Sequence, residues 1–143
     1  MMKRGWLIAA VCLLAVVLAG CAAAPPPGGR EVKTGDGVYR EITVSQLHEM
    51  LAHKDFLLVN VHIPYEGEIA NTDLFVPYNE IEQNLARLPQ DRGAKIVLYC
   101  RSGNMSATAA KTMVRLGYTN VWDVPGGMIA WEQQGYPLLR LPQ

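Results

Sequence analysis

Two kinds of segment alternate along this chain, and they predict different elements of secondary structure. Short runs of strand-forming residues, bounded by turn-forming residues, predict strands at 38–44, 56–61, 96–99 and 121–124. Apolar residues at helical spacing predict helices at 46–52, 78–88, 104–116 and 128–134. Strands that alternate with helices are typical of an α/β domain, with a mostly parallel central sheet flanked by helices on both faces.

Capping and turn-forming residues predict where these elements begin and end. Ser45 is the expected cap of the first helix, and Gly117 is the expected stop of the helix at 104–116. The stretch 62–77 contains Pro64 and Pro77, and we expect it to be irregular.

The N-terminus has the pattern of a secretory signal. Lys3 and Arg4 give a positive start, and the run from Gly5 to Ala19 is apolar and uncharged. This run is shorter than the roughly 20 residues that a membrane-spanning helix needs, and it fits the apolar region of a signal peptide. Leu18-Ala19-Gly20-Cys21 follows and resembles a bacterial lipobox, in which the cysteine receives the lipid.

These features divide the chain into three predicted parts. The parts are a lipoprotein signal peptide at 1–20, the lipidated Cys21 with a flexible linker at 21–37, and a domain at 38–143. Pro25-Pro26-Pro27-Gly28-Gly29 supports the linker, because it cannot continue a helix. We expect an exported protein of the cell envelope with an acylated (palmitate-type) anchor. The absence of Asp after Cys21 favours the outer membrane where the host has one. The alternative is an uncleaved signal anchor with an incidental cysteine.

Composition argues against several classes of function. Thirteen basic and thirteen acidic residues give a formal net charge of zero, so nucleic-acid binding has no electrostatic support. The chain has three cysteines, Cys12, Cys21 and Cys100. Only Cys100 lies in the predicted domain, which leaves neither a disulfide framework nor a four-ligand zinc site. His62 has Glu66 and Glu68 nearby but no second histidine, so we expect no metal.

The segment around Cys100 carries the candidate chemistry. The apolar strand at 96–99 delivers Cys100 to its carboxyl end, where ligands bind in open α/β sheets. A tight loop and a helix start follow, and backbone N–H groups in such a loop stabilise negative charge. We therefore expect Cys100 to react as a thiolate nucleophile. The expected substrate-binding residues are Arg101, Ser102, Gly103, Asn104, Met105 and Ser106. The alternative is a buried structural cysteine.

Several motifs resemble the rhodanese family. The Cys-x-x-Gly-x-x-Ser pattern of residues 100–106 resembles the active-site loop of that family. The following segments, in order and spacing, are similar to its C-terminal signature: Gly117-Tyr118, Asn120-Val121, Gly126-Gly127 with Trp131, and Gly135-Tyr136-Pro137. Ile42-Thr43-Val44-Ser45 and Leu58-Val59-Asn60-Val61 also match its layout, so the resemblance covers about residues 38–140. We interpret Gly126-Gly127 as a close backbone approach near the loop.

This resemblance implies a rhodanese-like fold and a sulfurtransferase. Cys100 would carry a persulfide, taking sulfur from a small anion such as thiosulfate and passing it to a thiol or a cyanide-like acceptor. No cofactor and no metal would be required. We expect a monomer that contacts the membrane only through its lipid anchor.

The chain departs from the family pattern at several positions. Asn60 and His62 stand where the family commonly has Asp and Arg, Glu68 stands in place of a usual His, and Met105 stands in place of a frequent Arg. These departures keep an alternative open: a catalytically weak rhodanese-fold module that binds a partner or carries sulfur in the cell envelope. A redox sensor is a further alternative. Phosphatase or arsenate reductase activity is disfavoured, because Met105 lacks the positive charge with which an Arg near the end of the loop would bind a phosphate.

Overall fold

The computed structural model describes residues 28–140 of the chain. The predicted signal peptide and the predicted lipidation site Cys21 lie outside the described residues. Within residues 28–140, no helix has the length and apolar character needed to cross a membrane.

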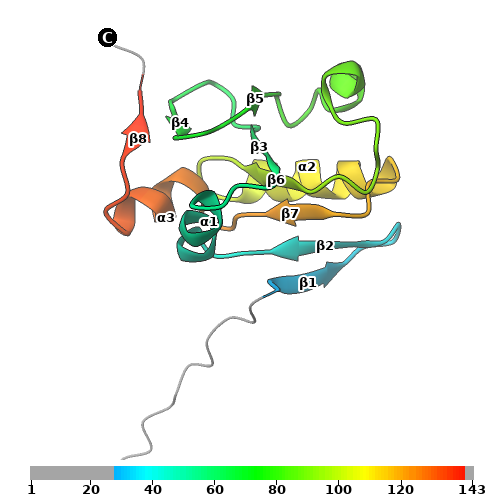
Figure 1. Cartoon of the computed structure of the whole chain (residues 1–143). Coiled ribbons are helices and arrows are strands. Elements are labelled where there is room, and N and C mark those ends of the chain that lie inside the picture. The colour runs from blue at the N-terminus through cyan, green and yellow to red at the C-terminus, as the bar shows by residue number, and fades with distance from the viewer. Residues whose placement is uncertain (1–27, 141–143) are drawn as a thin grey trace, which may run out of the picture.

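A six-stranded sheet forms the centre of the domain (Figure 1). Every neighbouring pair of strands is parallel except β1 with β2, which is antiparallel. The spatial order is β1 (Arg30–Lys33), β2 (Val38–Glu41), β7 (Val121–Asp123), β6 (Ile96–Tyr99), β3 (Leu57–Asn60) and β5 (Leu74–Phe75). A separate antiparallel pair consists of β4 (Glu68–Ile69) and β8 (Leu138–Leu139).

Helices cover both faces of this sheet. On one face lie α1 (Val44–Leu51) and α3 (Gly127–Gln133), whose buried residues share a hydrophobic core with the sheet. On the other face lie α2 (Asn104–Arg115) and the 3₁₀ helix η1 (Glu82–Arg87). The expectation of a mostly parallel α/β sheet with helices on both faces is therefore confirmed.

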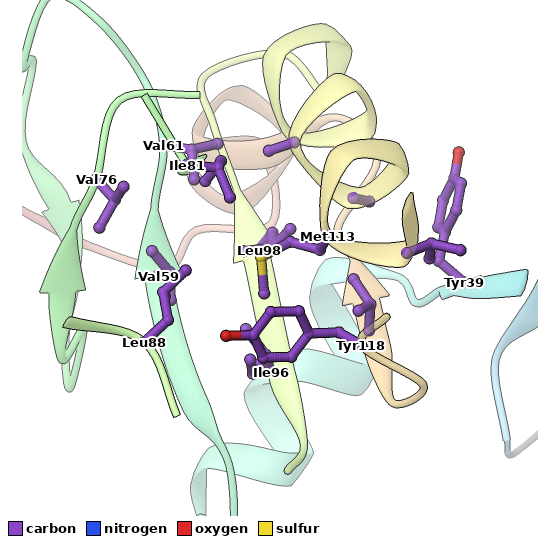
Figure 2. Close-up of a cluster of buried hydrophobic side chains, with 14 of the residues drawn as sticks. Tyr39, Val59, Val61, Val76, Ile81, Leu88, Ile96, Leu98, Met113 and Tyr118 are labelled. Carbon is purple, nitrogen blue, oxygen red and sulfur yellow. The ribbon is translucent and has the colours of Figure 1, made fainter. Parts of the chain in front are cut away.

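Strand β6 contributes buried side chains to both cores, because successive residues of a strand point to opposite faces. Ile96 and Leu98 belong to the core beneath α2, and Figure 2 shows them on the same side of the sheet as Met113. Val97 and Tyr99 belong to the core beneath α1 and α3. All residues of β6 are buried, so the strand is held from both sides and its carboxyl end is a fixed point in the domain.

Most of the predicted elements are present with small changes of boundary. The strands predicted at 96–99 and 121–124 are β6 and β7, and the helices predicted at 104–116 and 128–134 are α2 and α3. The stretch 62–77 is mostly irregular as expected, although it contains the two-residue strands β4 and β5.

The prediction of a continuous helix at 78–88 is wrong. The chain forms only the 3₁₀ helix η1 there, and Asn84 has non-helical dihedral angles (φ −106°, ψ 15°) that kink it. The Asn84 side-chain amide donates to the carbonyl of Glu80 at 2.8 Å. Bonds of this kind between a side chain and the backbone compete with helical hydrogen bonds.

The prediction that Ser45 caps the first helix is also wrong. Thr43 is the cap, and its hydroxyl accepts a hydrogen bond from the N–H of Gln46 at 3.1 Å. The Gln46 side chain in turn accepts from the N–H of Thr43 at 2.9 Å. This reciprocal capping box satisfies both amides, and the helix therefore begins at Val44 rather than at Gln46.

The predicted linker at 21–37 extends too far toward the C-terminus. Residues Arg30–Lys33 form β1, which pairs with β2 from Arg30 opposite Glu41 to Lys33 opposite Val38. The ordered domain therefore begins before residue 38. The segment is polar and exposed on most of its length, as is typical of an edge strand, and it lacks the apolar signal that would predict one.

Candidate active site

Cys100 directly follows β6 at the carboxyl end of the sheet. The residue is only 1% exposed and belongs to the core beneath α2. The backbone N–H of Gly103 donates to the Cys100 Sγ atom, with a nitrogen-to-sulfur distance of 3.0 Å. We call residues 100–106 the Cys100 loop. Its backbone supplies a hydrogen-bond donor to the sulfur, and such a donor stabilises a thiolate.

The start of α2 brings the loop into this position. Gly103 is the N-cap of α2 and has a left-handed backbone (φ +103°), which a residue with a side chain rarely adopts. Its N–H group can therefore turn back toward Sγ while its carbonyl accepts the first helical hydrogen bond, from Ala107 at 3.0 Å. Gly103, a predicted substrate-binding residue, thus contacts the sulfur through its backbone N–H.

Helix α3 clamps the loop from the opposite side. The N–H of Met128 donates to the Cys100 carbonyl at 2.9 Å, and the N–H of Ile129 donates to the Arg101 carbonyl at 3.0 Å. Gly127 lies so close that a Cβ atom there would sit 2.1 Å from the Cys100 carbonyl oxygen. The expected close backbone approach of Gly126-Gly127 to the loop is therefore confirmed, and the clamp leaves no room for a side chain at residue 127.

Ser106 and Asp123 lie buried behind the loop. The Ser106 hydroxyl donates to the Gly103 carbonyl at 3.1 Å, so this predicted substrate-binding residue also fixes the shape of the loop. Asp123, at the end of β7, is 1% exposed, and its Oδ1 atom has no hydrogen-bond partner. Burial, together with the charge of Glu41, raises the pKa of the Asp123 carboxyl to about 7, against the opposing effect of the Ser106 side chain and the Val124 backbone. Sequence reasoning missed Asp123, which is simply part of the predicted strand at 121–124.

The other predicted site residues have different surroundings. Ser102 and Asn104 are exposed, while Met105 is half-buried and packs against the core beneath α2. Arg101 is 56% exposed at its side chain, and its Nε atom lies 3.1 Å from Oε2 of Glu66. Arg101 is thus bound to a carboxylate of the protein, a partner that its position in the sequence did not reveal.

Glu66 also contacts His62. The same Oε2 atom lies 3.3 Å from Nε2 of His62, which is 8% exposed. The distance allows an ion pair when His62 is protonated, although the contact is not aligned as a hydrogen bond. Arg101, Glu66 and His62 form what we call the rim. A cavity of about 80 Å³ beside the rim is lined by Glu66, Arg101, Met128, Ile129, Glu132, Leu138 and Arg140.

Asn60 braces the segment that carries Glu66. Its side-chain amide donates to the carbonyl of Gly67 at 3.0 Å and accepts from the N–H of His62 at 3.0 Å. Asn60 is fully buried, so both bonds are shielded from water. The family pattern commonly has a charged Asp at this position. Here the neutral amide of Asn60 holds the segment 62–67 in place through hydrogen bonds to its backbone.

The fold and the site together define a class of protein. A cysteine at the carboxyl end of a central parallel strand, facing a backbone amide of a loop that opens a helix, is the arrangement of an enzyme with a thiolate nucleophile. The chain belongs to the family of rhodanese-like domains, whose model matches residues 43–134.

Individual relatives agree with this assignment. The chain is 36% identical over 103 residues to a protein of Allochromatium vinosum named sulfurtransferase, covering 69% of this chain and 94% of that protein. It is 32% identical over 116 residues to the tRNA uridine(34) hydroxylase of Photorhabdus laumondii, covering 74% of this chain but only 32% of the hydroxylase. The crystal structure of a rhodanese-related protein from Thermoplasma volcanium matches with a TM-score of 0.61 and 34% identity, covering 71% of this chain and 98% of that one.

These comparisons support a sulfurtransferase at the level of reaction class. The family model and the named sulfurtransferase point to transfer of sulfur, and the structural match agrees with the fold described above. The hydroxylase is a much longer protein that contains a similar region. The comparisons leave open which sulfur compound is the donor.

Proposed function

We propose that this protein transfers sulfane sulfur from thiosulfate or a similar donor to a thiophilic acceptor, with Cys100 as the carrier. The observation that carries the proposal is the hydrogen bond from the Gly103 N–H to the Cys100 Sγ atom at 3.0 Å, at the carboxyl end of β6. Such a bond favours the charged form of the sulfur, which is the nucleophile. Neither a metal nor an organic cofactor has a part in the reaction.

The transfer takes place in two displacements. In the first, the Cys100 thiolate attacks the outer sulfur of thiosulfate, a new S–S bond forms, and the S–S bond of the donor breaks. Sulfite leaves with the electron pair. In the second, a thiolate or cyanide attacks the outer sulfur of the Cys100 persulfide, and Cys100 leaves again as a thiolate. The N–H of Gly103 serves both steps, because the sulfur that it faces carries negative charge at the start and at the end.

A second candidate function is a sulfur carrier or binding module with little turnover of thiosulfate. One observation favours it: Arg101 is the only cationic side chain in residues 100–106, and it is paired with Glu66. Thiosulfate would therefore meet no unpaired cation in the loop. Steady-state kinetics distinguishes the two candidates, because a carrier accepts sulfur without releasing it rapidly to small acceptors.

The experiment is an assay of thiocyanate formation from thiosulfate and cyanide by the full chain in detergent. The sulfurtransferase proposal predicts turnover by the wild type and none by Cys100→Ser. Ser45→Ala serves as a control, because Ser45 lies in α1, outside the Cys100 loop, and is not the cap of that helix. Absence of turnover in a folded wild type with a reduced Cys100 would contradict the sulfurtransferase proposal and favour the carrier function.

We further propose that the chain is exported and anchored to a membrane of the cell envelope through a lipid on Cys21. The lipobox-like sequence Leu18-Ala19-Gly20-Cys21 at the end of the apolar run supports this location. The test is metabolic labelling of cells that express the chain with an alkyne-tagged fatty acid. Label on the wild type, membrane association, and loss of the label in Cys21→Ser would support the anchor, while an unlabelled wild type would refute it.

A further inference from the structure

The rim contains a carboxylate whose position calls for an explanation. The backbone of Glu66 is fixed at two neighbouring points, since Arg140 donates to the Glu66 carbonyl at 3.1 Å and Asn60 donates to the Gly67 carbonyl at 3.0 Å. The side chain then reaches the guanidinium of Arg101, the residue directly after the nucleophile. Glu66 is therefore held in place beside the Cys100 loop.

The contact with Glu66 changes what Arg101 can do for a donor. The carboxylate cancels the charge of the loop's one cationic side chain, and a donor that needs this cation must compete with Glu66 for it. His62 lies against the same carboxylate oxygen at 3.3 Å. The half-exposed pair of Arg101 and Glu66 is worth a modest free energy, and its effect on a doubly charged donor is correspondingly modest.

We propose that Glu66 determines donor specificity: by occupying Arg101 it disfavours doubly charged inorganic donors such as thiosulfate, and it favours persulfides of small organic thiols. This inference rests on the proposed sulfurtransferase function and adds the class of its donor. An organic persulfide R–S–SH loses a singly charged thiolate, R–S⁻, when the Cys100 thiolate attacks its outer sulfur. Because its leaving group carries a single negative charge, such a donor depends less than thiosulfate does on electrostatic stabilisation by a cation at the rim.

The test compares two donors, thiosulfate and cysteine persulfide, with the full chain in detergent and a thiol acceptor. Glu66→Gln is expected to lower the KM for thiosulfate by about threefold to fivefold, the size of one surface ion pair. The kcat for thiosulfate and the KM for cysteine persulfide are expected to stay within about twofold, because the substitution frees Arg101 without altering the Cys100 loop.

Two controls separate a specific effect of Glu66 from a general loss of negative charge. Glu132→Gln removes a carboxylate from the same cavity, but one that pairs with Arg140 at 2.6 Å, and it is expected to leave the KM for thiosulfate within about twofold. In an Arg101→Ala background, Glu66→Gln is expected to have no further effect, since Glu66 acts through Arg101.

Three outcomes would overturn the inference. The KM for thiosulfate could be unchanged or higher in Glu66→Gln, it could fall equally in Glu132→Gln, or the effect of Glu66→Gln could persist without Arg101. Failure of both donors to load Cys100 in every variant is a different result. That result would refute the sulfurtransferase proposal itself, and the inference about Glu66 with it.

Discussion

The Cys100 loop and the rim beside it are built in different ways. The loop is held by backbone groups, with Gly103 donating to Sγ and the amides of Met128 and Ile129 donating to loop carbonyls. The rim is held by side chains, with Arg101 and Glu66 56% and 39% exposed. Backbone contacts within a packed core change little when single side chains change, whereas exposed ion pairs are individually weak. This difference agrees with our proposal that the loop carries the sulfur chemistry and that the rim influences the choice of donor.

The largest expected effect is that of Gly127→Ala, which adds a methyl group inside the clamp on the loop. The new Cβ would lie 2.1 Å from the Cys100 carbonyl oxygen, and α3 would have to separate from the loop. We expect the free energy of unfolding to fall by about 3 kcal/mol or more, from overpacking and a strained backbone together. Urea unfolding followed by circular dichroism measures this change.

Gly117→Ala is the matched control for that substitution. Gly117 also has a positive φ (+90°), but a Cβ there meets nothing within 4 Å. The expected loss is about 1 kcal/mol, from the backbone conformation alone. Equal losses in the two variants would show that the clamp on the loop is not tight.

A smaller effect is expected from Asp123→Asn, and it depends on pH. Because the pKa of Asp123 is raised to about 7 in the folded protein, from an ordinary value of 3.8, the folded state retains this proton where the unfolded chain has lost it. The contribution of Asp123 to stability is therefore fully present below about pH 4 and is lost as the pH rises from there to about 7, above which it no longer changes. Between pH 5 and pH 8 we expect the wild type to lose about 2.5 kcal/mol more of its free energy of unfolding than Asp123→Asn does.

The measurement for Asp123 is a set of urea unfolding curves for both proteins at several pH values. Comparing the two proteins cancels the other groups that titrate in this range. Parallel pH dependences would contradict the raised pKa of the buried carboxyl. A steeper pH dependence in the wild type would support a buried, titrating carboxyl at Asp123 behind the loop, in contrast to Glu66, an exposed carboxyl at the rim.

The smallest expected effect on stability is that of Arg101→Ala. The pair of Arg101 and Glu66 is half-exposed, so its removal is expected to change the free energy of unfolding by less than about 0.5 kcal/mol. Thermal and urea unfolding of the variant provide the check. A loss of more than about 1.5 kcal/mol would mean that the rim is part of the structural core, and the contrast between loop and rim would fail.

Local sequence signals predict much of the fold, and their failures have physical causes. The apolar run at 96–99 predicts β6 with its observed boundaries, because a strand that is buried on both faces is a nearly continuous run of apolar residues in the sequence. The edge strand β1 is missed, since its burial is slight and its residues are mostly charged. The helix predicted at 78–88 fails because Asn84 bonds to the backbone and interrupts it.

The site likewise contains features that the sequence predicts and features that it does not. The proposed nucleophile Cys100 and the turn residue Gly103 are only three positions apart in the sequence, so the strand–loop–helix pattern is enough to predict their arrangement. The pairing of Arg101 with Glu66 joins residues far apart in the chain, and only the folded sheet brings them together. Asp123 is likewise invisible in sequence, because a carboxylate at the end of a strand is ordinarily exposed and nothing local indicates its burial.

The most direct test of the account is the mass of the intact protein after incubation with a sulfur donor. The full chain in detergent is incubated with thiosulfate or, separately, with cysteine persulfide, freed of the donor and weighed. The account predicts a gain of one sulfur atom, about 32 Da, which is absent in Cys100→Ser and is discharged by cyanide or a thiol. A folded, reduced wild type that gains no sulfur from either donor, or a Cys100→Ser variant that gains it equally, would contradict the assignment of Cys100 as the sulfur carrier.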